Sequence, residues 1–203
     1  MKNQATIIMA ICLFCFLFYR CTNTSDGAVV NNDSTSSNVN MYAGYASQSE
    51  WGKHLATTLG CGDCHTPKRM TDHGPADDSS LMFSGYSGKL PSLVLSAEQR
   101  SKGVAATFDN TGWIGPWGNS YAANITSDST GIGNWSEEQF ITCIRQGLYK
   151  GIKDSRPIMP PMPINSFRNL TDDELKALFA FLKSVKPVHN VVPEYQPSTG
   201  ASK

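Results

Sequence analysis

The sequence predicts an all-α fold with long loops. Three segments start with a capping box, in which a Ser or Thr caps a helix and a Glu or Gln three residues later bonds back to it. They begin at Ser47, Ser136 and Thr171. The 17 Gly and 11 Pro residues indicate many turns, and 40% hydrophobic residues suit a globular protein. With 203 residues the chain is long enough for one ordinary domain and flanking segments.

The charge balance excludes some classes of partner. The formal net charge is zero and the sequence pI is about 6.9. A basic surface for nucleic acid or an anionic membrane is therefore not indicated, and we expect no nucleic-acid partner.

The N-terminal residues 1–21 have the pattern of a signal peptide, and one form that they allow is a lipoprotein signal. Ala5–Tyr19 is a mostly apolar run of fifteen residues, shorter than the roughly 20 residues that a membrane span needs. Cys21 follows where a lipidated cysteine would stand, although Arg20 replaces the small residue usual before it. Lipidation, ordinary cleavage and an uncleaved anchor all remain open. Each of them exports the domain, so we expect a periplasmic or envelope-facing protein.

The remaining chain divides by composition into three parts. Residues 22–41 are rich in Asn, Ser, Thr and Asp and read as a disordered tether. Residues 42–193 form the predicted domain, and 194–203 form a flexible tail.

The chemistry-bearing motif is Cys61-Gly-Asp-Cys64-His65, which has the C-x-x-C-H spacing of c-type haem attachment. Two thiols one helical turn apart can add to the two vinyl groups of one porphyrin, and the adjacent histidine can give iron its proximal nitrogen. A thioredoxin-type redox pair would need a βαβ setting, which the sequence does not indicate. A zinc site would need a second ligand pair, but the next cysteine, Cys143, stands alone.

A predicted helix leads into this motif and presents Trp51, Leu55 and Leu59 on one apolar face. Between residues 66 and 117 the sequence predicts no regular structure, apart from a short helix within 96–106. We expect a backbone carbonyl in this region to accept the free ring N–H of His65, since such bonds orient a ligating imidazole. The candidates are Pro67, Pro75 and Pro91.

Two further helices follow. The first starts at the Ser136 capping box, runs through Phe140 to Leu148, and ends near Gly147 and Gly151. Cys143 on this helix is expected to be a small buried residue. The second starts at Thr171 and is stopped by Pro187. Its apolar stripe consists of Leu175, Leu178, Phe179, Leu182 and Val185.

Between these helices lies a proline-rich loop, RPIMPPMPIN at 156–165, which contains Met159 and Met162. Its prolines keep the loop extended and stiff. A methionine in a stiff loop can keep a weak thioether–iron bond from being lost to chain entropy. The other histidines, His54, His73 and His189, are expected to be ordinary loop or surface residues.

The order of CGDCHTP, YAANITSDSTGIGNWSEEQF, PPMP and LTDDELKALFAFLKSVKPV resembles the cytochrome c family. Within the family it is most similar to cytochrome subunits that accompany bacterial membrane-bound alcohol, gluconate and aldehyde dehydrogenases. The resemblance covers about residues 45–193. Those subunits often carry three C-x-x-C-H motifs, whereas this chain has one. The stretch between His65 and Tyr121 is longer than the usual family form.

The resemblance implies a cytochrome c fold in which helices pack around one covalently bound haem c with its iron. Cys61 and Cys64 would be the thioether anchors, His65 the proximal ligand and Met162 the distal ligand, with Met159 as the alternative. The segment 124–126 and Trp135 would line the pocket. The first helix would pack against the last.

These expectations predict a carrier of single electrons rather than an enzyme, because two filled axial positions leave no iron site for a substrate. Its partners would be redox proteins on the dehydrogenase or terminal-oxidase side, docked through a small interface. A labile Met162 would instead allow a ligand sensor or a peroxidase-like enzyme. A third alternative is a cytochrome subunit that anchors a dehydrogenase, with lipidated Cys21 as the membrane attachment.

Overall fold

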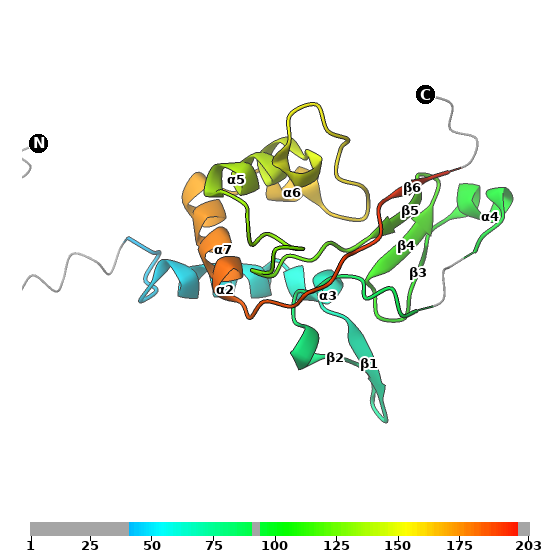
Figure 1. Cartoon of the computed structure of the whole chain (residues 1–203), viewed down its shortest axis with the longest axis horizontal. Helices are drawn as coiled ribbons and strands as arrows, with labels where there is room; N and C mark the ends of the chain where they lie inside the picture. The colour runs from blue at the N-terminus through cyan, green and yellow to red at the C-terminus, as the bar shows by residue number, and fades with distance from the viewer. Residues whose placement is uncertain (1–40, 91–93, 199–203) are drawn as a thin grey trace, which may run out of the picture. The chain divides into compact units, whose positions relative to one another are not determined.

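The computed structural model describes residues 41–90 and 94–198 (Figure 1). The predicted signal segment 1–21 and the predicted tether up to residue 40 lie outside the described residues. In the part of the chain that is described, no helix is both long and apolar enough to cross a membrane.

The prediction of an all-α fold is wrong, because the described residues also form two antiparallel sheets. One is a hairpin of two strands, β1 (Lys68–Thr71) and β2 (Gly74–Asp77). The other has the order β3-β4-β5-β6. Its strands are β3 (Ala105–Ala106), β4 (Gly112–Gly115), β5 (Gly118–Tyr121) and β6 (Gln196–Pro197). The strands β1 to β4 lie within 66–117, where the sequence predicts no strand, and β5 follows directly after that region.

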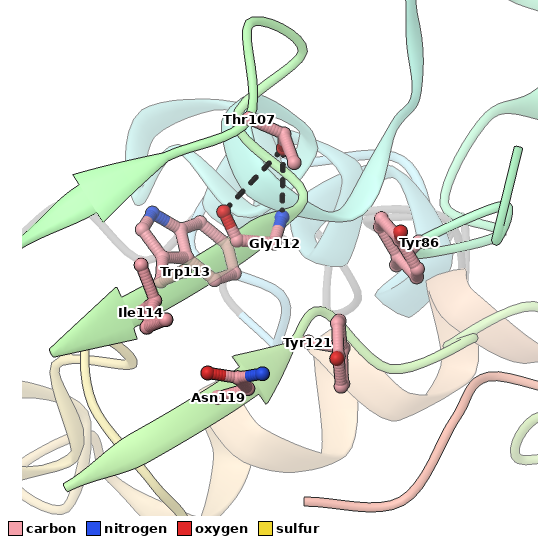
Figure 2. A pocket seen from close by; sticks show the side chains of 7 residues that line it. All are labelled: Tyr86, Thr107, Gly112, Trp113, Ile114, Asn119 and Tyr121. Carbon is pink, nitrogen blue, oxygen red and sulfur yellow. Dashed lines mark hydrogen bonds between the residues drawn. The ribbon is translucent and has the colours of Figure 1, made fainter. Parts of the chain in front are cut away.

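A small open pocket lies beside the four-stranded sheet (Figure 2). The rings of Tyr86 and Tyr121 stand next to each other in its wall, with their centroids 4.8 Å apart. The remaining lining residues are Thr107, Gly112, Trp113, Ile114 and Asn119.

The first described helix, α2 (Gln48–Thr58), begins where the sequence predicts. The Ser47 hydroxyl accepts a hydrogen bond from the Glu50 amide at 3.1 Å. The predicted apolar face is only partly correct. Leu55 and Leu59 are half-buried and pack against the core, but the fully buried residues of α2 are Gly52 and Ala56.

The last helix, α7 (Asp172–Ser184), begins with a complete capping box at Thr171. The Glu174 amide donates to Thr171 Oγ1 at 3.2 Å, and the Thr171 amide donates to the Glu174 carboxylate at 2.7 Å. This start confirms the sequence prediction. The cap satisfies amides that have no partner inside the helix.

Replacing Thr171 by Ala should lower the free energy of unfolding by about 1 kcal/mol, the usual cost of losing a helix cap. Thr57→Ala is the matched control, because the Thr57 hydroxyl lies inside α2 and donates to the carbonyl of Lys53, and its loss should be nearly neutral. Urea denaturation of both variants measures the difference. An equal loss in the two variants would contradict the role of the cap.

The remaining helices lie between these two. Helix α5 (Glu137–Gln146) starts at Ser136, which accepts from the Gln139 amide, and ends at Gly147 with φ 67°. Its start confirms the prediction, and Cys143 is buried as expected. The helix stops at Gly147 as predicted, but Leu148, predicted to belong to it, lies beyond its end. The short helices are α3 (Cys61–His65), η1 (Ser79–Leu81), α4 (Ala97–Lys102), η2 (Tyr149–Gly151) and α6 (Ile164–Phe167).

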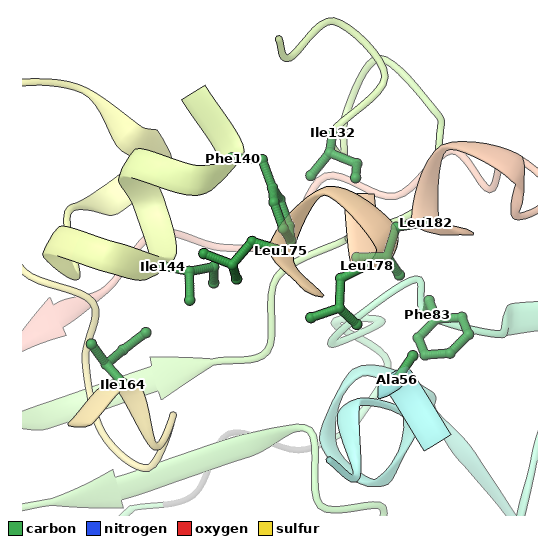
Figure 3. Close-up of a cluster of buried hydrophobic side chains, with 9 residues drawn as sticks. All are labelled: Ala56, Phe83, Ile132, Phe140, Ile144, Ile164, Leu175, Leu178 and Leu182. Atoms are coloured by element: carbon green, nitrogen blue, oxygen red, sulfur yellow. The ribbon is translucent and has the colours of Figure 1, made fainter. Parts of the chain in front are cut away.

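The main core lies between α2, α5 and α7 (Figure 3). Helix α7 contributes three leucines, which meet residues of α2, α5 and α6 and two loop residues. The cluster consists of Ala56, Phe83, Ile132, Phe140, Ile144, Ile164, Leu175, Leu178 and Leu182. The packing of α2 against α7 confirms the expected contact of the first and last helices.

Candidate haem-binding site

The two motif cysteines lie on α3, a short helix that follows Gly60. Gly60 has φ 69°, a left-handed conformation that glycine adopts without strain. Cys61 and Cys64 are one helical turn apart and both are half-buried. The structure therefore provides the paired thiols that the motif predicts.

The two alternative interpretations of the cysteine pair are disfavoured. Burial raises the pKa of Cys61 to about 11 and also raises the pKa of Cys64. A dithiol redox centre needs the opposite, a lowered thiol pKa. Among residues 41–90 and 94–198, no three His, Cys, Asp or Glu side chains come together as a metal site.

The His65 ring is held by a backbone carbonyl. Its Nδ1 lies 2.8 Å from the Ala123 carbonyl oxygen. Because a carbonyl can only accept, Nδ1 carries the proton and Nε2 keeps its lone pair. Burial lowers the pKa of His65, and the hydrogen bond to Ala123 opposes this only in part. The ring is therefore held neutral, as a metal ligand must be.

The predicted acceptor for this ring was wrong. The Pro67 carbonyl instead accepts from the Asp78 amide at 2.9 Å, and Pro91 lies outside the described residues. The actual acceptor, Ala123, is 58 residues from His65 in the sequence. The contact depends on tertiary packing that brings the two segments together.

Segment 83–86 carries this packing. The Gly85 amide donates to the His65 carbonyl at 2.8 Å, and the neighbouring Tyr86 amide donates to the Ala122 carbonyl at 3.0 Å. A Cβ on Gly85 would lie 2.5 Å from the Ala123 carbonyl oxygen, and Gly85 has φ 77°. Only glycine fits between the motif and its carbonyl acceptor.

The four-stranded sheet also reaches the motif, a contact that the sequence does not reveal. Asn110 lies in the turn between β3 and β4 with φ 56°. Its Nδ2 lies 3.5 Å from Cys64 Sγ and 3.4 Å from the Asp63 carbonyl oxygen. The Asn110 side-chain oxygen accepts from the Trp113 indole at 3.3 Å. The long segment after the motif therefore contacts one of its cysteines.

The structure separates the two methionines of the proline-rich loop. Both are half-buried. Met162 packs against the core cluster, which Cys61 also contacts, whereas Met159 does not belong to that set. The three other histidines do not join the site. The ring of His54 lies beside the ring of Tyr45, and both His73 and His189 are exposed.

The segment predicted to line the pocket is partly used for other contacts. Ile125 and Trp135 pack against the core cluster. Asn124 is buried, and its side chain bonds Thr130 and the carbonyl of Val188. The pocket in Figure 2 is lined by none of the predicted site residues.

Comparison with known families decides the identity. A model of the cytochrome c family matches residues 49–186, more than half of the chain. The chain belongs to the cytochrome c family. It is an electron-transfer cytochrome, and its cofactor is covalently bound haem c with iron.

The cytochrome is similar to parts of longer bacterial proteins. It is 31% identical over 147 residues to the fructose dehydrogenase cytochrome subunit of Gluconobacter japonicus, which covers 71% of this chain and 23% of the relative. It is 42% identical over 82 residues to a nicotinate dehydrogenase subunit of Pseudomonas putida, covering 40% and 7%. For the cytochrome c subunit of the quinone alcohol dehydrogenase of Gluconobacter oxydans, the identity is 41% over 75 residues, covering 36% and 15%. The chain thus spans less than a quarter of each relative.

The donor groups of this cytochrome fit haem c. Two thiols one turn apart match the two vinyl groups of the porphyrin, and a neutral imidazole with a free Nε2 follows directly. Met162 of the proline-rich loop carries a thioether, a soft donor, and packs against the same core cluster as Cys61.

Proposed function

We propose that this cytochrome carries single electrons through a haem iron held by His65 and Met162 and anchored at Cys61 and Cys64. The observation that carries the proposal is the hydrogen bond from His65 Nδ1 to the Ala123 carbonyl. This bond fixes the ring orientation and leaves Nε2 for the iron. When bound, haem c supplies a reversible one-electron couple, whose potential His/Met ligation raises.

Each of the remaining residues holds or shields the group. Cys61 and Cys64 fix its position covalently through α3. Met162 would supply the second protein ligand to the iron, supported by its packing against the core cluster that Cys61 contacts. An iron bound by both His65 and Met162 would have no place for a substrate, which favours a carrier over a sensor or a peroxidase-like enzyme.

The partner that the relatives support is a dehydrogenase. The similar proteins are named as subunits of fructose, nicotinate and alcohol dehydrogenases. The cytochrome would accept electrons from such an enzyme, either as a stable subunit or as a shuttle toward a terminal oxidase. Co-purification of a dehydrogenase with the tagged full-length chain would favour the stable subunit.

Export of the domain completes the proposal. The apolar run of residues 5–19 supports a signal peptide, and Cys21 supports a lipid anchor. The cytochrome would then work in the periplasm or at an envelope surface. Metabolic labelling with a fatty acid, compared between wild type and Cys21→Ala, tests the anchor.

The test of the carrier function is carried out on the haem-loaded wild type. A potential titration followed by visible absorption should fit a one-electron transition. Carbon monoxide should leave the spectrum of the reduced protein unchanged, because a closed iron has no free position. Rapid and complete binding of carbon monoxide would mean an open iron and would favour the sensor or enzyme.

A further inference from the structure

The chain continues past helix α7 as an extended segment, residues 186–198, which we call the C-terminal strap. It begins where the family match ends, at residue 186. The strap carries no helix, and its last residues form β6, which pairs with β5 (Figure 1). It therefore connects the helical core to the four-stranded sheet.

One side chain of the strap, that of Asn190, forms hydrogen bonds with the Ser84–Tyr86 turn, which contacts His65. Asn190 Nδ2 donates to the Ser84 carbonyl at 2.7 Å and to the Tyr86 carbonyl at 3.0 Å. Its backbone amide donates to Thr130 Oγ1 at 3.0 Å. A single amide group thus bridges the two carbonyls that flank Gly85.

The same turn also contacts His65 and Ala123, the two residues joined by the hydrogen bond of the ring. The Gly85 amide bonds the His65 carbonyl, and the Gly85 Cα lies so near Ala123 that no Cβ fits between them. Moving this turn would therefore move both the histidine backbone and the carbonyl that holds its ring.

A second set of hydrogen bonds joins the strap to the segment that follows Ala123. Asn124 Nδ2 donates to the Val188 carbonyl at 2.9 Å, and the Val188 amide donates to Thr126 Oγ1 at 3.2 Å. The strap therefore bonds both the Ser84–Tyr86 turn, which contacts the His65 carbonyl, and the segment that follows Ala123.

We propose that Asn190 is a positioning residue for the proximal ligand: through the Ser84–Tyr86 turn it sets the hydrogen bond between His65 Nδ1 and the Ala123 carbonyl. This inference rests on the proposed ligation of iron by His65. A carbonyl that accepts the ring proton increases the basicity of the other nitrogen, which stabilises the oxidised iron. Loss of the Asn190 hydrogen bonds would weaken the bond between His65 Nδ1 and the Ala123 carbonyl and would therefore raise the reduction potential.

The experiment compares haem-loaded wild type with Asn190→Ala. The first measurement is exchange of the His65 Nδ1 hydrogen with solvent, followed by NMR in protein labelled with ¹⁵N-histidine. Exchange should become at least about tenfold faster in the variant, because the variant loses both hydrogen bonds to the turn and the loss of one bond alone changes a local opening by about this factor. The second measurement is the reduction potential, which should rise.

The matched control is Asn169→Ala. Asn169 also donates its side-chain amide to one backbone carbonyl, that of Asn165 at 2.9 Å, but it lies between α6 and α7. Its variant should keep both wild-type values. If Asn190→Ala does not fold, Asn190→Asp, which keeps the size of the side chain but has no hydrogen to donate to the two carbonyls, should show the same changes.

Two results overturn the inference in distinguishable ways. If the Asn190 variants match Asn169→Ala in exchange and potential, the strap does not position the ligand, and ligation by His65 still stands. If the wild-type His65 ring resonances show no iron-induced shift, the proposed ligation fails, and the inference fails with it.

Discussion

Replacing Met162 by Ala should convert the ferric haem-loaded protein from low spin to high spin. The weak long-wavelength absorption band of an iron–thioether bond should disappear completely, because alanine has no atom that can ligate iron. The reduction potential should fall, since the thioether ligand raises it. Visible absorption and a potential titration measure both changes.

Met159→Ala is the matched control for this prediction. Met159 belongs to the same proline-rich loop and is also half-buried, but it does not pack against the core cluster. Its variant should keep the band and the potential. Loss of the band in Met159→Ala and its retention in Met162→Ala would assign the distal position to Met159 instead.

Replacing Gly52 by Ala should lower the free energy of unfolding by about 3 kcal/mol, a typical upper cost of overpacking a core. A Cβ at this position would lie 1.8 Å from the Ala177 carbonyl oxygen and 2.8 Å from Phe181 Cβ. Helices α2 and α7 would have to move apart. The higher helix propensity of alanine, worth up to about 1 kcal/mol, offsets only part of this cost.

Gly103→Ala provides the comparison for Gly52. Gly103 ends α4 with φ 177°, and a Cβ added there would meet no atom within 4 Å beyond its chain neighbours. Its replacement should change the free energy of unfolding by less than about 0.5 kcal/mol. Guanidinium denaturation of both haem-loaded variants gives the two values, and a similar loss in both would refute close packing of α2 on α7.

The helix starts could be predicted because their signal is local. Ser47, Ser136 and Thr171 each cap a helix through an amide three residues ahead, so a four-residue pattern contains the whole interaction. The C-x-x-C-H motif is equally short, and it identified the cofactor correctly.

The strands could not be predicted in the same way. β4 has the sequence GWIG and β5 has GNSY, which are too short and too rich in glycine to show an alternating pattern. Their pairing, and that of β5 with β6, depends on partners elsewhere in the chain. The pairing of β5 with β6 joins residues about 78 positions apart in the sequence. The hydrogen bond that the Tyr195 hydroxyl donates to the Trp117 carbonyl spans the same separation.

The acceptor for His65 was missed for a related reason. A backbone carbonyl is present at every residue, so no side chain distinguishes Ala123 from its neighbours. The signal that could have pointed to it is Gly85, a residue required by close approach of two segments. The sequence shows this glycine but not what it approaches.

The outer strands of the four-stranded sheet restrict how another protein can bind there. β3 and β6 have two residues each, and Pro197 in β6 has no amide hydrogen. A long, unpaired strand edge would offer backbone groups to a strand from another chain, but such short outer strands offer few. We therefore expect a redox partner to recognise side chains of this cytochrome rather than to extend its sheet by strand addition.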